Sequence, residues 1–158
     1  MSIVLTPRQQ CDLEMILNNG FAPLKTFLNK EDYFSVLNNM RLSTGELWPM
    51  PIVLSADKTF IENLFKCCES TIGERSLEIT LLNEENLPLA KIINPEFYKP
   101  DVKLECEKVF NSTDKNHPYI KETLEQKNTY YLSGELVELN PFPHFDFREN
   151  RLTPQQTK

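Results

Sequence analysis

The first forty residues carry apolar side chains at the spacing of two short helices. Thr6, Pro7 and Gln9 predict the start of the first helix, because threonine caps the N-terminus, proline fits the first turn and glutamine reaches back to the cap. Gly20 is expected to end this helix, since glycine readily adopts the left-handed conformation that closes many helices. The buried face of the helix is expected to comprise Leu13, Ile16 and Leu17.

A second helix is expected after Asn29, whose side chain is a good N-terminal cap. Glu31 and Asp32 would then lie in the first turn, where the helix dipole favours negative charge. Its buried stripe is expected to be Tyr33, Val36, Leu37 and Met40. Apolar residues at helical spacing predict three further short helices, at 58–65, 102–110 and 119–125.

The strands are predicted from alternating apolar and polar positions. Leu77, Ile79 and Leu81 alternate with polar residues, as in a strand with one buried face, and a polar turn at 83–86 is expected to join it to a returning strand. The expected strands are 51–54, 77–81, 87–93, and a pair at 129–133 and 135–139 joined through Gly134. Short strands interleaved with short helices predict an α+β domain built around a partly closed small barrel.

The tryptophan-containing stretch before the first of these strands is stiff. Trp48, the only tryptophan, follows a turn at Gly45 and is bracketed by Pro49 and Pro51. Each proline fixes its own φ and biases the preceding residue away from helix, so this stretch is expected to be extended. We interpret Trp48 as a side chain of the core rather than a surface that binds a ligand.

Composition limits the function classes. The 158 residues are 40% hydrophobic and 25% charged, which is ordinary for one globular domain. The formal net charge is −6, which argues against nucleic acid as the main partner, because that binding depends on Lys and Arg. No membrane-spanning run and no signal-like N-terminus is recognised, so we expect a soluble cytoplasmic protein.

Cysteines and glycines suggest no metal or nucleotide site. The four cysteines, Cys11, Cys67, Cys68 and Cys106, form no Cys-x-x-Cys pair and are expected to be buried, reduced thiols. The four glycines lie too far apart in sequence to form a phosphate-binding loop.

His117 and His144 are the only histidines and the first candidates for acid–base chemistry. Each lies beside a proline, with Asp114 or Asp146 as a possible carboxylate partner, but a histidine in such a turn more often orders the loop. The paired carboxylates Asp12/Glu14 and Glu84/Glu85 are expected to be solvated surface. Whether Arg41 and Arg148 pair with carboxylates of this domain or of a neighbouring one is left open.

Several segments resemble the N-terminal domain of ATP sulfurylase (sulfate adenylyltransferase), and they span nearly the whole chain in the family's order. They are Leu5-Thr-Pro-Arg-Gln-Gln-Cys-Asp-Leu-Glu14, Gly20-Phe-Ala-Pro-Leu24, Leu42-Ser-Thr-Gly-Glu-Leu-Trp-Pro-Met-Pro-Ile-Val-Leu54, Tyr98-Lys-Pro-Asp101, Pro143-His-Phe-Asp-Phe147 and Arg151-Leu-Thr-Pro154.

This resemblance implies a PUA-like small β-barrel with flanking short helices over residues 1–150. Residues 151–158 would begin a linker or helix toward a catalytic domain, because Thr153 and Gln156 repeat the helix start seen at Thr6. In the family, ATP, magnesium and sulfate are bound by that other domain, through Gln-x-Arg-Asn and His-x-x-His motifs. Neither motif occurs in this chain, so we expect no catalytic, cofactor-binding or metal-binding residue in it.

Two functions from different classes therefore remain. The first is a non-catalytic domain of a sulfate adenylyltransferase, which packs on and shapes a catalytic domain in cis or in trans, with oligomerisation possible. The second is a stand-alone PUA-like module that binds RNA or protein. The first is favoured because the basic residues are interleaved with acidic ones instead of forming a basic stripe. The chain alone is expected to be inactive.

Overall fold

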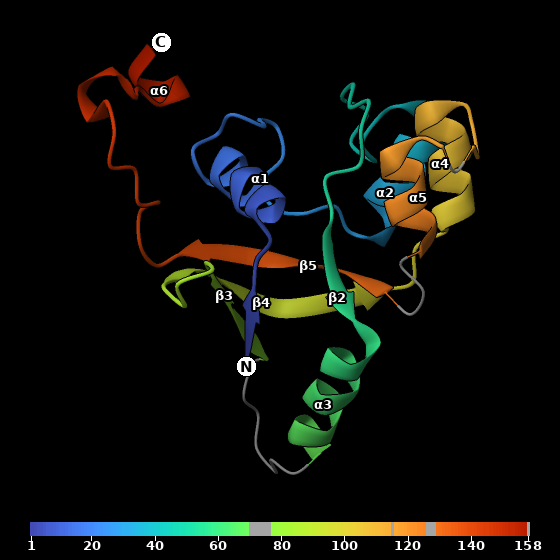
Figure 1. Ribbon diagram of the computed structural model, residues 1–158, viewed down its shortest axis with the longest axis horizontal. Coiled ribbons are helices and arrows are strands. Elements are labelled where there is room, and N and C mark those ends of the chain that lie inside the picture. Colours follow the sequence, from blue (N-terminus) through green and yellow to red (C-terminus); the bar gives the residue numbers. More distant parts are fainter. Residues whose placement is uncertain (70–76, 115, 126–128, 158) are drawn as a thin grey trace. The chain divides into compact units, whose positions relative to one another are not determined.

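The computed structural model describes residues 1–69, 77–114, 116–125 and 129–157 (Figure 1). The chain divides into two compact units, and each is described by itself. The first comprises Met1–Phe27, Thr71–Pro95 and Ser133–Lys158, and the second comprises Leu28–Ser70 and Glu96–Leu132. Two long strands, β4 (Pro88–Tyr98) and β5 (Thr129–Glu138), contribute residues to both units. The strands are hydrogen-bonded in the order β1-β3-β4-β5-β2, and the expected α+β class is confirmed.

The first unit contains the expected hairpin. Strand β3 (Glu78–Leu82) pairs antiparallel with β4, and the turn between them is held by Asn83, whose side-chain oxygen accepts from the backbone N–H groups of Glu85 and Leu87. A short strand that the sequence did not predict, β1 (Ser2–Val4), pairs parallel with β3. Strand β3 therefore has a neighbour on each side and buries Ile79 and Leu81.

Helix α1 (Pro7–Leu17) also belongs to the first unit and begins as predicted. The Thr6 side chain accepts from the backbone of Gln9, and the Gln9 side chain accepts from the backbone of Thr6. Leu13 and Ile16 form its buried face. The predicted end at Gly20 is wrong, because the left-handed residue is Asn19, with φ 62°.

The predicted strand pair through Gly134 is also wrong: β5 is one continuous strand that passes through this residue. Gly134 has φ 152°, and a Cβ there would lie 2.5 Å from the Ile92 side chain and 2.9 Å from the Ile93 carbonyl oxygen. The glycine therefore serves close packing against β4 rather than a turn. On the other side of Gly134, its own carbonyl oxygen accepts a hydrogen bond from the Thr26 hydroxyl.

The second unit holds most of the helices. Helices α2 (Lys30–Asn39), α4 (Val102–Phe110) and α5 (Pro118–Glu125) lie together in Figure 1, and strand β2 (Leu54–Asp57) leads directly into α3 (Lys58–Glu69). The predicted helix positions are confirmed, as is the cap at Asn29, and Asp101 caps α4 by accepting from the Leu104 N–H. The predicted strand at 51–54 is displaced along the chain, since β2 begins only at Leu54. Pro51 has no N–H to donate to a neighbouring strand, which disfavours a strand at that residue.

The loop between α2 and β2 departs from two expectations. Met40 is not part of a buried stripe: it closes α2 in the left-handed conformation, and its side chain is 59% exposed. The loop then folds back on itself, since the Trp48 N–H donates to the Met40 carbonyl at 2.8 Å. Trp48 is half-buried and is not among the fully buried side chains. It is therefore less buried than the interpretation as a core residue implies.

The core of the second unit contains a polar cluster that the sequence did not reveal. Glu105, on α4, is only 1% exposed, and its Oε2 accepts hydrogen bonds from the Tyr33 hydroxyl at 2.8 Å and the Tyr131 hydroxyl at 2.9 Å. Tyr98 packs against both tyrosine rings, and its hydroxyl donates to the Leu28 carbonyl at 2.8 Å. Three aromatic rings thus surround one buried acidic side chain.

Candidate functional site

The candidate site is a hollow of about 320 Å³ in the first unit. One wall is the C-terminal end of α1, and the other is the segment that follows β5. Its lining residues are Glu14, Leu17, Asn18, Asn19, Glu138, Pro141, Phe142, His144 and Thr153. The lining combines polar and apolar residues, and it includes two acidic residues and a histidine.

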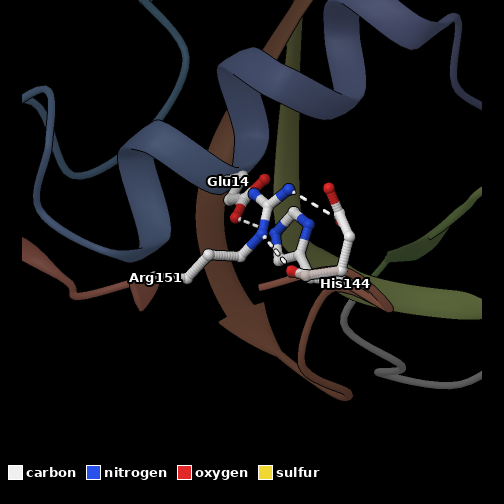
Figure 2. Close-up of polar contacts among 4 residues, drawn as sticks. Glu14, His144 and Arg151 are labelled. Atoms are coloured by element: carbon white, nitrogen blue, oxygen red, sulfur yellow. Dashed lines mark hydrogen bonds and ion pairs between the residues drawn. The ribbon is translucent and has the colours of Figure 1, made fainter. Parts of the chain in front are cut away.

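The Glu14 and His144 side chains join the two walls. His144 Nε2 lies 2.5 Å from Glu14 Oε1, although the two residues are 130 positions apart in sequence. Figure 2 shows the two side chains pointing toward one another, with Arg151 drawn beside them. Each side chain keeps about a third of its surface exposed, 32% for His144 and 31% for Glu14, so the pair is accessible to solvent and to a bound molecule. The interpretation of Glu14 as merely solvated surface is therefore wrong.

Asp146, one of the two carboxylates considered as a histidine partner, pairs with Arg151. The Arg151 guanidinium donates to the Asp146 carboxylate at 3.0 Å and to its backbone carbonyl at 3.1 Å. The hydrogen bond from Arg151 to the carboxylate, a backbone hydrogen bond to the same carboxylate and the guanidinium charge hold the pKa of Asp146 below its usual value. A short turn closes the same segment, because the Asn150 N–H donates to the Phe147 carbonyl at 2.9 Å.

The other sequence candidates lie elsewhere. His117 is exposed, its ring packs on Phe110 with centroids 5.2 Å apart, and its backbone N–H donates to the Asp114 carbonyl at 3.1 Å. Arg41 donates to the Gly45 carbonyl at 2.8 Å, which stabilises its own loop. Arg148 lies in the short 3₁₀ helix η1 (Arg148–Asn150), and its side chain lies outside the described residues.

The remaining carboxylates and the thiols give a mixed result. Glu84 and Glu85 are exposed as expected, but Asp12 is half-buried on α1, and this burial raises the pKa of its carboxyl group. Cys106 is a buried free thiol, whereas Cys11 is free but exposed, so the expectation of burial is wrong for Cys11. The side chains of Cys67 and Cys68 lie outside the described residues.

The hollow places a carboxylate and an imidazole in hydrogen-bonding contact. A carboxylate that fixes an imidazole is half of an acid–base arrangement, but it needs a positioned reacting group within hydrogen-bond reach. Thr153, which also lines the hollow, instead caps α6 (Pro154–Thr157), where its hydroxyl accepts from the Gln156 N–H at 3.4 Å. Within the described part of the chain, no group of three or more His, Cys, Asp or Glu is placed to hold a metal ion.

A family model described as a PUA-like domain matches residues 1–141, and the chain belongs to this family. The expected PUA-like fold is thereby confirmed. Among curated proteins, the chain is similar to the sulfate adenylyltransferases of Candida albicans (44% identical), Schizosaccharomyces pombe (38%) and Saccharomyces cerevisiae (38%). These matches cover 98–99% of this chain but only 28–30% of each relative.

A solved structure supports the fold alone. The chain is similar to part of the hexameric APS kinase from Thiobacillus denitrificans, with a TM-score of 0.65 and 22% sequence identity. The likeness covers 98% of this chain and 24% of that chain. Separately, none of the helices in the described ranges has both the length and the apolar character needed to cross a bilayer.

Proposed function

We propose that this chain is the non-catalytic PUA-like domain of a sulfate adenylyltransferase. The enzyme would convert ATP and sulfate to adenylyl sulfate and pyrophosphate in the cytoplasm, and this domain would pack on its catalytic domain and shape it. One observation carries the proposal. A segment that makes up 28–30% of each relative matches 98–99% of this chain, at 38–44% identity.

The chemistry of the hollow is consistent with a non-catalytic role. Attack of sulfate on the α-phosphate of ATP brings two anions together, so the site must supply cationic and amide donors. Glu14 and Glu138 instead bring negative charge to the hollow, and the whole chain carries a formal net charge of −6. Such a surface repels both substrates, so ATP and magnesium would be held by the catalytic domain only.

The test joins two measurements. The purified chain is assayed for pyrophosphate release and is melted with and without saturating ATP, sulfate and magnesium; we expect no turnover and no thermal shift. A chimera is then made in which the chain replaces the matched segment of the Candida albicans relative, and we expect it to form adenylyl sulfate.

Each alternative has its own result. Turnover by the chain alone, or an ATP-dependent shift of several degrees, would show a catalytic or nucleotide site in the domain itself. An inactive, unassembled chimera would contradict the proposed role. Micromolar binding of generic RNA at about 150 mM salt, with a steep salt dependence, would instead support a nucleic-acid-binding module.

A further inference from the structure

Exposed apolar side chains are concentrated in the last part of the first unit's sequence. Phe145 is 80% exposed and Phe147 is 77% exposed, although burying a phenylalanine side chain is normally favourable by about 1.5–3 kcal/mol. Over only sixteen positions the exposed large hydrophobic residues are Val137, Leu139, Phe145, Phe147 and Leu152. A concentration of this kind marks an interaction surface more often than ordinary solvent-facing surface.

The two rings are presented by an ordered segment. On one side, His144 is bonded to Glu14 of α1; on the other, Arg151 holds Asp146 through its carboxylate and its carbonyl. Phe147 itself has φ 48°, a left-handed conformation that is costly for a bulky residue and persists only where the surrounding contacts impose it. Because these contacts already fix the backbone, docking the rings would order little additional chain.

The surroundings of the rings match the anatomy of a protein–protein interface. Aromatic anchors are flanked by the Glu14–His144 and Asp146–Arg151 pairs, and the hollow described above is lined by residues of the same segment. Such interfaces combine an apolar centre with a polar rim and a concave neighbour. Stacking on RNA bases is not favoured, because the charges beside these rings in the sequence balance, Asp146 and Glu149 against Arg148 and Arg151, whereas surfaces that bind single strands combine aromatic rings with an excess of positive charge.

We infer that this surface, defined by Phe145, Phe147 and Leu152, is the face on which the catalytic part of a sulfate adenylyltransferase docks. The inference rests on the proposed function and names its contact surface. The length of the Candida albicans relative suggests the occupant. The match covers 30% of that polypeptide, so about 70% of it lies outside the matched segment and can contact the domain. The rim carries charges of both signs, which would meet complementary charged or hydrogen-bonding side chains on the docked face.

The test uses the chimera with the Candida albicans relative and follows its thermal unfolding. Docking stabilises a domain, so the transition of this chain should lie higher in the chimera than in the isolated chain. Phe145→Ser with Phe147→Ser should lower that transition by about 4–8 °C, the effect of losing central interface anchors from a domain of this size. Leu152→Ser alone should cause a smaller shift in the same direction.

Two controls isolate the effect from folding. The double variant of the isolated chain should melt within about 2 °C of the unchanged chain, because both rings are exposed in it. Leu47→Ser, which removes a 67% exposed apolar side chain in the second unit, should leave the chimera unchanged.

The outcomes separate the inference from the proposed function. If the unchanged chimera is inactive and its transition matches that of the isolated chain, the proposed function fails. A second set of outcomes applies if the chimera is active. If the double variant or Leu152→Ser then melts at the temperature of the unchanged chimera, or if Leu47→Ser lowers the transition as much as the double variant does, the docking surface is wrong and the proposed function stands. If the isolated chain dimerises and the double variant abolishes the dimer, the occupant is a second copy and the inference is overturned.

Discussion

The buried Glu105 cluster makes the sharpest prediction about stability. Two tyrosine hydroxyls, from Tyr33 on α2 and Tyr131 on β5, donate to the same carboxylate oxygen at 2.8 Å and 2.9 Å. Glu105 is 1% exposed, so water does not replace a donor that is removed. The perturbations we consider are Tyr33→Phe and Tyr131→Phe, each of which deletes one hydroxyl and keeps the ring.

A hydrogen bond to a charged group contributes about 1.5–3 kcal/mol to stability. Each single variant should therefore lower the free energy of unfolding by about 2 kcal/mol, or the melting temperature by about 4–8 °C for a chain of this length. The double variant should cost more than the sum, because it leaves Oε2 without either tyrosine donor while the acidic side chain stays buried.

Urea unfolding followed by circular dichroism measures these free energies, and Tyr130→Phe is the matched control. Tyr130 lies beside Tyr131 in the same strand but is only half-buried, so its hydroxyl should contribute within about 0.5 kcal/mol. If Tyr131→Phe proves as mild as Tyr130→Phe, or if the two cluster variants are simply additive, the hydroxyls do not stabilise the carboxylate as the distances suggest.

Three further predictions follow from the same structure. Burial, with the nearby Glu105 charge, raises the pKa of Tyr33 and Tyr98 above the ordinary value near 10. The folded state therefore keeps these protons at a pH where the unfolded state loses them, so unfolding measured over a pH series should show stability lost as pH rises past about 10. Gly134→Ala should destabilise the protein by about 2–3 kcal/mol in urea, because the added Cβ meets backbone at a positive φ, whereas Gly45→Ala, with open space around it, should cost only about 1 kcal/mol. Trp48→Ala should cost less than the about 3–5 kcal/mol of a fully buried aromatic, because its ring is half-buried; a larger loss on thermal unfolding would contradict the observed exposure.

The sequence predicted the features that short-range chemistry controls. The capping box at Thr6, the cap at Asn29 and the helix at 102–110 all depend on residues within a few positions of one another, and the structure has them where they were expected. The hairpin around Asn83 is local in the same sense. Patterns of this kind are visible in one sequence because the interacting groups are sequence neighbours.

The features that were missed depend on distant residues. The sequence suggested a turn at Gly134, because the residues that approach it in space, Ile92 and Ile93, lie about forty positions away along the chain. Only their approach explains a glycine inside a strand. The Glu14–His144 pair spans 130 positions. Glu105 falls in a helix with two Glu and two Lys residues, where nothing in the spacing distinguishes it from the exposed Glu107.

The polar groups of this chain act mainly on position. Glu105 orders three rings in one unit, and His144 and Arg151 hold a segment of the other, from which two phenylalanine rings project. Under the proposed function, such a domain would affect the reaction through where it holds the catalytic domain, since small displacements at a catalytic centre cost large factors in rate. Under the same proposal, loss of the inferred docking surface should lower the turnover of the chimera, because the groups that touch ATP and sulfate would all lie in the docked part. That pattern is what separates a shaping domain from a catalytic one.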